Sequence, residues 1–261
     1  MNRLQAELQR LYLPGASHED PPATGLADSD GRVRALVVEL RLPIGWDTVA
    51  ALWQDVQTEL DLPAPAIAVN GIDGYQVWFS LQQPVAVAQA MKFLEALRRR
   101  YLGDMAPRLM TLMPALDASR PGQLRLAGLL PAVQAESGRW SAFLAPDLAG
   151  LFADEPWLDF PPSPDAQADL LLRLRSIKPA DFLRVMDQLQ ADEAQTAQDP
   201  VAVPLQSATG TAWCQDPALA AADIDPRRFL LAVMRDPSAE LGLRVEAAKA
   251  LLPYFEVGQR D

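Results

Sequence analysis

The stretch "AIAVNGIDGYQVWFSLQQPV", residues 66–85, predicts two short apolar strands joined by an Asn-Gly-Ile-Asp-Gly turn. In the second strand Gln76, Trp78 and Ser80 alternate with apolar residues, so one side of this strand is apolar and Gln76 points to the other. A glutamine is unexpected on a hairpin otherwise rich in apolar and aromatic residues. The hairpin indicates a sheet, and the role of Gln76 depends on what surrounds it.

The segments on either side of this hairpin complete a recognisable order of elements. Their patterns predict a strand, a helix, the hairpin, a second helix opened by Pro84, and two further strands: residues 32–43, 46–60, 66–82, 84–101, 107–116 and 122–128. This order is a split βαβ arrangement, an antiparallel sheet with helices on one face. The fold class expected is therefore α+β, with an open sheet face available for binding.

The rest of the chain suggests a division into regions. Residues 1–31 read as an N-terminal helix and loop, residues 32–160 as the α+β domain, and residues 161–261 as an all-α region. Pro-rich "DEPWLDFPPSPD", residues 154–165, marks the boundary between the last two. A linker is predicted at about residues 195–218, followed by a helical hairpin.

Composition limits the class of protein. The chain of 261 residues is long enough for two domains with a core each. No apolar run approaches the roughly 18 residues of a membrane helix, so we expect a cytoplasmic protein with no membrane partner. One cysteine and one histidine exclude an internal disulfide and the usual zinc site. Any metal would need carboxylate ligands, which favours magnesium or manganese.

The net charge of −11 argues against a surface coated with phosphate-binding residues. Residues 92–145 nevertheless hold eight Lys or Arg against four acids, so a polyanion would contact the first half of the chain. The alternative is that the three arginines at 98–100 complement the negative end of a helix.

Three stretches carry a resemblance to a known family: "ALVVELRLP" (35–43), "VNGIDGYQVWFSLQQPV" (69–85) and "GQLRLAGLLPAVQAESGRWSAFLAPDLAGLF" (122–152). In this order they resemble motifs of the archaeo-eukaryotic primase superfamily, in the branch found on plasmids, phages and other mobile elements. The resemblance covers about residues 32–155. It implies an RRM-like sheet, metal-dependent nucleotidyl transfer and a role in DNA replication or mobilisation of a mobile element.

The chain departs from the family at the positions that carry this chemistry. Family members place two metal-binding acids on the first strand, where this chain has Glu39 and Arg41. Residues two apart on a strand share a face, so the arginine would repel a cation there. Gln76 stands where the family has a histidine that contacts the nucleotide, and Asp117 is the nearest candidate for a third acid.

We therefore expect a catalytically degenerate primase-fold protein without a resident cofactor that binds DNA or a replication partner. The expected contact residues are Arg41, Gln76, Trp78, Arg120 and Arg125.

Three alternatives remain at this stage. An active primase or polymerase would use Glu39 and Asp117 with magnesium or manganese. An adaptor would use its acidic helical half to bind a protein partner. In the plainest interpretation, Gln76 is an exposed strand residue and Glu39 and Arg41 form a same-face ion pair worth under about 1 kcal/mol.

The C-terminal stretches "FLLAVMRDP" (229–237) and "RVEAAKALLPY" (244–254) are weakly similar to phage small-terminase-like proteins. This similarity implies protein contacts through the helical region. The alternative is an ordinary helical hairpin that closes the fold.

Overall fold

The computed structural model describes residues 2–14, 25–117, 120 and 123–198. The chain divides into two compact units, residues 1–201 and 202–261, and the account below concerns the first. The predicted C-terminal hairpin and most of the predicted linker lie outside the described residues.

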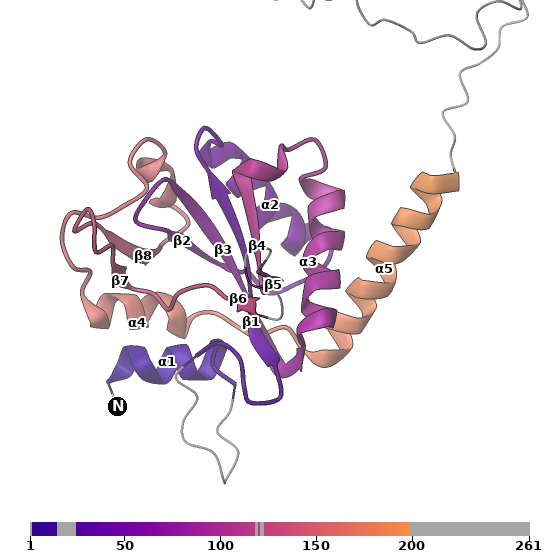
Figure 1. Cartoon of the computed structure of the whole chain (residues 1–261), viewed down its shortest axis with the longest axis horizontal. Helices are drawn as coiled ribbons and strands as arrows, with labels where there is room; N and C mark the ends of the chain where they lie inside the picture. The colour runs from indigo at the N-terminus through magenta and orange to yellow at the C-terminus, as the bar shows by residue number, and fades with distance from the viewer. Residues whose placement is uncertain (1, 15–24, 118–119, 121–122, 199–261) are drawn as a thin grey trace, which may run out of the picture. The chain divides into compact units, whose positions relative to one another are not determined.

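The first unit is a mixed α+β structure built on an antiparallel sheet (Figure 1). The strand order is β4-β1-β3-β2-β8-β7, and β5 and β6 form a separate two-stranded sheet. The strands are β1 (Arg32–Arg41), β2 (Ala66–Val69), β3 (Gly74–Ala86), β4 (Met110–Met113), β5 (Ala115–Leu116), β6 (Leu124–Arg125), β7 (Ala132–Val133) and β8 (Trp140–Leu144). The α-helices are α1 (Arg3–Leu11), α2 (Trp46–Thr58), α3 (Val87–Tyr101), α4 (Pro164–Leu172) and α5 (Pro179–Gln198), with short 3-10 helices η1 (Pro107–Leu109) and η2 (Ala149–Phe152).

Several predicted boundaries differ from the structure, and the strand predicted over residues 107–116 is divided into η1, β4 and β5. β3 continues through Pro84, because its last residues still pair with the start of β1, and α3 therefore begins at Val87. Strands β7 and β8 were not predicted, and they extend the sheet beyond β2. β7 has two residues and β8 has five, which is too short for an alternating pattern to mark them clearly.

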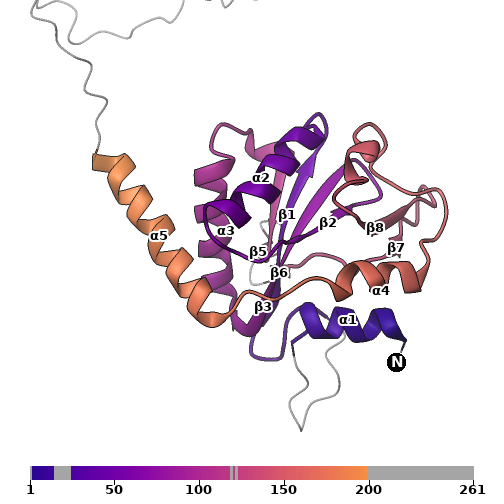
Figure 2. The same ribbon diagram turned by 180° about the vertical axis from the view of Figure 1, so that it is seen from behind.

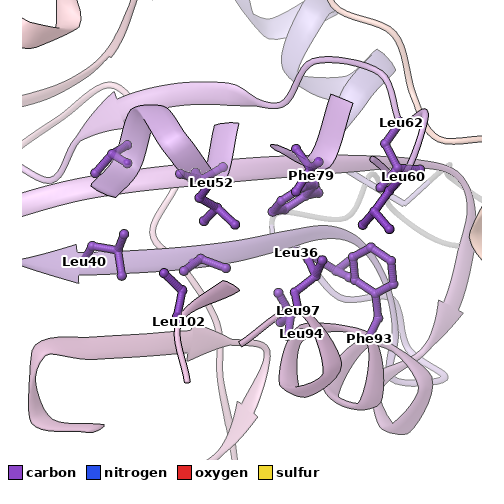
Figure 3. Close-up of a cluster of buried hydrophobic side chains, with 14 of the residues drawn as sticks. Leu36, Leu40, Leu52, Leu60, Leu62, Phe79, Phe93, Leu94, Leu97 and Leu102 are labelled. Atoms are coloured by element: carbon purple, nitrogen blue, oxygen red, sulfur yellow. The ribbon is translucent and has the colours of Figure 1, made fainter. Parts of the chain in front are cut away.

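The main core lies between one face of the sheet and the helices α2 and α3. Figure 3 shows Leu36 and Leu40 of β1 and Phe79 of β3 in this core with side chains of both helices. Leu36, Val38 and Leu40 recur at every second position of β1, so they share a face, and the helices bury their apolar stripes against it. The first turns of α5 join this core, where the ring of Phe182 stacks on that of Phe93 at 5.2 Å between centroids.

The second face of the sheet is also covered over part of its area, which corrects the prediction of helices on one face alone. Helices α1 and α4 lie side by side there (Figures 1 and 2). Strand β1 is apolar on both sides, since Ala35 and Val37 are as buried as the residues of the main core. The apolar residues of α1 therefore have a surface to pack against.

Helix α1 is fixed to the sheet by Arg34 of β1. The Arg34 guanidinium donates to the carbonyl oxygens of Arg10 and Leu13 at 2.7 and 3.0 Å, and to that of Leu81 at 2.8 Å. The bond to Arg10 satisfies a carbonyl group of the last helical turn, which has no partner within the helix, and Leu13 lies just beyond the helix end. Within the described part of the chain, no helix is both long and apolar enough to span a membrane.

Candidate functional site

Beyond α1 and α4, the second face of the sheet is hollowed at the end where β1 stops and β3 begins. The hollow has a volume of about 310 Å³. Its walls come from β1, β3, the turn between β2 and β3, and the segment that leads into β7 and β8: Glu39, Arg41, Asn70, Ile72, Asp73, Gln76, Gly128, Leu129, Leu130, Ala132, Gln134 and Ser141. Three of the predicted site residues, Glu39, Arg41 and Gln76, meet here.

Strand register brings Glu39 and Gln76 together. Glu39 of β1 lies directly opposite Gln76 of β3 in the antiparallel pair. The Gln76 amide donates from Nε2 to Oε2 of Glu39 at 2.7 Å, and its Oε1 accepts from the indole Nε1 of Trp78 at 2.9 Å. Gln76 is 6% exposed, so the interpretation of an exposed strand residue is wrong. The glutamine suits this position because it donates and accepts at once, between a carboxylate and an indole.

Trp78 is buried behind the hollow rather than inside it. Its ring packs edge-on against Tyr12, at 5.2 Å between centroids, and against Phe143, at 5.7 Å. With 1% of its surface exposed, Trp78 does not present a face to a ligand. The expectation that Trp78 contacts nucleic acid directly is therefore corrected: Tyr12, which follows α1, and Phe143 cover the ring, and its indole donates to Gln76 instead.

Arg41 closes the other side of the Glu39 carboxylate. Its Nε and Nη2 both donate to Oε1 of Glu39, at 3.2 and 3.1 Å, which confirms the predicted ion pair on one face of the strand. The Arg41 side chain is 37% exposed and the Glu39 side chain is 10% exposed. The third guanidinium nitrogen, Nη1, takes no part in these two bonds.

The turn before β3 forms the rim of the hollow. Oδ1 of Asn70 accepts from the backbone N–H groups of Ile72, Asp73 and Gly74 at 2.9 to 3.0 Å. Gly71 has φ of 78°, and a Cβ there would come within 2.9 Å of the Ser141 nitrogen. The Asn-Gly turn is therefore held by its own side chain and packed closely against β8.

Sequence reasoning missed four polar residues of the lining: Asn70, Asp73, Gln134 and Ser141. The asparagine and aspartate stand in a recognised turn pattern, so their place at the rim could have been deduced from the hairpin. Gln134 and Ser141 gave no such signal. They reach the hollow because β8 pairs with β2, and Gln134 Nε2 donates to the Asn70 carbonyl oxygen at 2.9 Å.

The residues at the hollow do not fit a pair of divalent cations. Both oxygens of Glu39 already accept hydrogen bonds, Oε1 from the Arg41 guanidinium and Oε2 from the Gln76 amide. The other carboxylate in the lining is that of Asp73. The described residues contain no group of three or more His, Cys, Asp or Glu arranged to hold a metal. A cation at Glu39 would have to displace the Arg41 guanidinium, which carries the same charge.

The remaining predicted site residues lie on a neighbouring hairpin. Asp117 follows β5, and its backbone N–H donates to the Gln123 carbonyl oxygen at 2.9 Å. Arg120 and Arg125 are exposed on the same β5–β6 hairpin, and none of the three lines the hollow. The chain continues from this hairpin over the second face, where Leu130 is buried, into the wall of the hollow.

The arginines at 98–100 form ion pairs within the molecule. Arg98 and Arg99 contact Glu95 at 2.7 and 3.1 Å, and Arg100 contacts Glu59 at 2.9 Å. Hydrogen bonds from Arg98 and Arg100 lower the pKa values of Glu95 and Glu59 respectively. The three arginines lie in the last turn of α3, which agrees with the interpretation that they complement the negative end of a helix.

No protein-family model matches the chain, and a search of curated proteins gives no match either.

Proposed function

We propose that this chain is a catalytically degenerate primase-like protein that serves replication or mobilisation of a genetic element. In this proposal it acts in the cytoplasm by binding DNA or a replication partner, and it does not transfer nucleotides. The primase-like sheet remains as a scaffold, and the hollow at Glu39, Arg41 and Gln76 is what remains of the reaction site.

The order of elements supports the primase-like part of the proposal. The series β1, α2, β2, β3, α3, β4 gives adjacent antiparallel strands in the order β4-β1-β3-β2, with α2 and α3 on the same face. An RRM-like split βαβ unit has this connectivity. Strands β8 and β7 would then be an extension at the β2 edge.

The hydrogen bonds of Glu39 support the proposed loss of catalysis. In a two-cation mechanism, the metal ions bridge the attacking and leaving oxygens, and free carboxylates must hold them. Here the Arg41 guanidinium lies 3.1 Å from one oxygen of Glu39, and Gln76 Nε2 lies 2.7 Å from the other. The one acid kept from the family pair is therefore engaged in a buried hydrogen-bonded series that stabilises the fold.

A primer-synthesis assay with manganese, nucleotides and single-stranded template tests the loss of catalysis. We expect no product from the natural chain or from Glu39→Ala. Arg41→Asp serves as a third sample, because it places a second acid two positions after Glu39, where the family has its pair of acids. Primer synthesis by the natural chain that Glu39→Ala abolishes would instead establish an active primase.

Binding of labelled single-stranded DNA, followed by fluorescence anisotropy, tests the retained role. We expect weak binding that falls as salt rises, since the chain has a net charge of −11. Arg41→Ala and Arg125→Ala should each weaken it, whereas Lys178→Ala, on an exposed loop away from the hollow, should not. The adaptor would be favoured by a different result: the chain does not bind DNA, it captures a replication protein, and Arg41→Ala does not weaken that capture.

A further inference from the structure

A Pro-rich segment between β8 and α4 presents an aromatic side chain at the surface of the first unit. Its sequence is "DFPPSP", residues 159–164. Phe160 is 79% exposed and belongs to neither of the two buried clusters of the core. The residues that follow it, 161–164, are exposed or half-buried. Figures 1 and 2 show the chain between β8 and α4 along the outer side of this unit, so the segment is open to a partner.

The prolines hold the backbone of this segment in an extended, polyproline II conformation. Each proline fixes its own φ at about −65° and drives the residue before it out of the helical region. Ser163, which precedes Pro164, has φ of −63° and ψ of 124°, close to polyproline II values. Such a segment has about three residues per turn, so Pro161 and Pro164 fall on the same side of it.

Both ends of the segment are fixed to the sheet. At its start, Leu158 and Trp140 exchange two backbone hydrogen bonds, of 3.0 and 2.8 Å. At its end, helix α4 is bonded to β8 through Gln167, whose buried amide contacts the backbone N–H and carbonyl oxygen of Phe143 at 2.8 and 2.9 Å. A partner therefore meets a segment that is already ordered, which lowers the entropic cost of binding.

The segment lies in an acidic stretch of the chain. Residues 154–165 hold four acids and no Lys or Arg. One of them, Asp165, has a basic neighbour, since its Oδ1 lies 3.7 Å from Nη1 of Arg3. Asp159, directly before Phe160, is exposed and forms no ion pair within the described part of the chain. A partner that contacts Phe160 therefore meets an uncompensated carboxylate beside it, which favours basic residues there.

Grooves lined with aromatic side chains bind Pro-rich segments of this kind, because the polyproline II helix is preformed. Aromatic residues such as phenylalanine are enriched at the centres of protein interfaces. We infer that residues 159–164 are a docking segment for a partner protein whose groove is lined by aromatic side chains and has basic residues at its edge. This inference does not depend on the proposed function, because none of these residues lines the hollow at Glu39.

Isothermal titration of the full-length chain with an isolated EVH1 domain tests the inference. This domain is the probe because its class binds Pro-rich segments in an aromatic-lined groove. We expect the natural chain to bind and Phe160→Ser to weaken the affinity by about tenfold or more, because the aromatic anchor is lost. Leu151→Ser is the matched control and should leave the affinity unchanged, since Leu151 is 80% exposed and lies outside the segment.

A charge reversal tests the acidic side of the segment. Asp159→Lys should weaken binding of the same domain by about threefold or more at low salt, and by less as salt rises. Asp147→Lys makes the same change on an exposed aspartate outside the segment and should have no effect. Equal effects of the two substitutions would contradict a basic edge on the partner.

Failure of the natural chain to bind, or unchanged affinity in Phe160→Ser, would overturn the inference. So would binding of a free peptide of residues 157–166 when the folded chain does not bind, because the fold would then not present the segment. Analytical ultracentrifugation separates a further outcome: self-association of the natural chain that Phe160→Ser abolishes would identify the occupant as a second copy and contradict the aromatic-lined groove.

Discussion

At the residue scale, Gln76 satisfies two buried partners at once, the carboxylate of Glu39 and the indole of Trp78. We expect Gln76→Ala to lower the free energy of unfolding by about 1 to 3 kcal/mol, because it leaves both groups without their partner away from water. Urea unfolding measures the change. Gln82→Ala is the control, since Gln82 lies on the same strand and is exposed. Equal effects of the two substitutions would mean that water replaces the amide at no cost.

Tyr12 carries a buried hydroxyl with no hydrogen-bond partner among the described residues. Burial raises the pKa of this hydroxyl above its ordinary value. We expect Tyr12→Phe to leave the free energy of unfolding unchanged or to raise it by up to about 1 kcal/mol, because the ring contacts remain and the unpaired oxygen is removed. A thermal unfolding midpoint that falls in this variant would reveal a partner for the hydroxyl.

At the scale of elements, β3 passes close to β1 at Gly74. Gly74 lies opposite Arg41, and a Cβ there would meet the Leu40 carbonyl oxygen and come within 2.9 Å of the Arg41 Cα. We expect Gly74→Ala to destabilise the protein by about 1 to 3 kcal/mol, because the backbone of one strand must move. Gly128→Ala provides the comparison, because a Cβ added at this glycine, which lines the hollow, would meet nothing within 4 Å. Similar unfolding curves for the two variants would contradict the close approach.

Also at the scale of elements, Arg34 of β1 attaches α1 to the sheet. Arg34 is partly buried, which lowers the pKa of its guanidinium, and it donates to carbonyl groups at the end of α1. Without these bonds the helix end should open more often, so we expect Arg34→Met to speed hydrogen exchange of the amides of residues 3–11 by about tenfold or more. Arg32→Met, an exposed neighbour on the same strand, should leave this exchange unchanged.

At the scale of the whole molecule, the buried tyrosines predict a loss of stability in alkali. Burial raises the pKa of Tyr75 to about 12, and that of Tyr101 is also raised, chiefly by burial. An unfolded tyrosine releases its proton near pH 10, so between about pH 10 and 12 the unfolded chain binds fewer protons than the folded one. The free energy of unfolding therefore falls as pH rises through this window.

Urea midpoints at about pH 8 and about pH 11 measure this loss. Tyr75→Phe removes one ionisable hydroxyl together with its bond to the Ala149 carbonyl oxygen. The variant should be less stable at the lower pH and lose less stability on going to the higher one. A loss identical to that of the natural chain would show that Tyr75 does not contribute.

The core and the order of the first six elements were accessible from the sequence. The alternation of side chains in β1 and β3 and the apolar stripes of α2 and α3 are local patterns. Each pattern predicts which side of its own strand or helix is buried. The ion pair of Glu39 and Arg41 was predictable for the same reason, because residues two apart on a strand share a face. The burial of Trp78 was not predictable, since it depends on α1, which lies more than sixty residues away in the chain.

The sequence by itself determined which residues could share a side of each element, because strand and helix periodicities depend on local backbone geometry. It thus placed Glu39 beside Arg41 and set Gln76 apart from the apolar core. Only the tertiary structure decided that Gln76 lies opposite Glu39, that β8 supplies a wall of the hollow, and that α1 and α4 cover part of the second sheet face. Pairing between strands and docking of helices join residues distant in the chain, and no local pattern specifies which distant surfaces will meet.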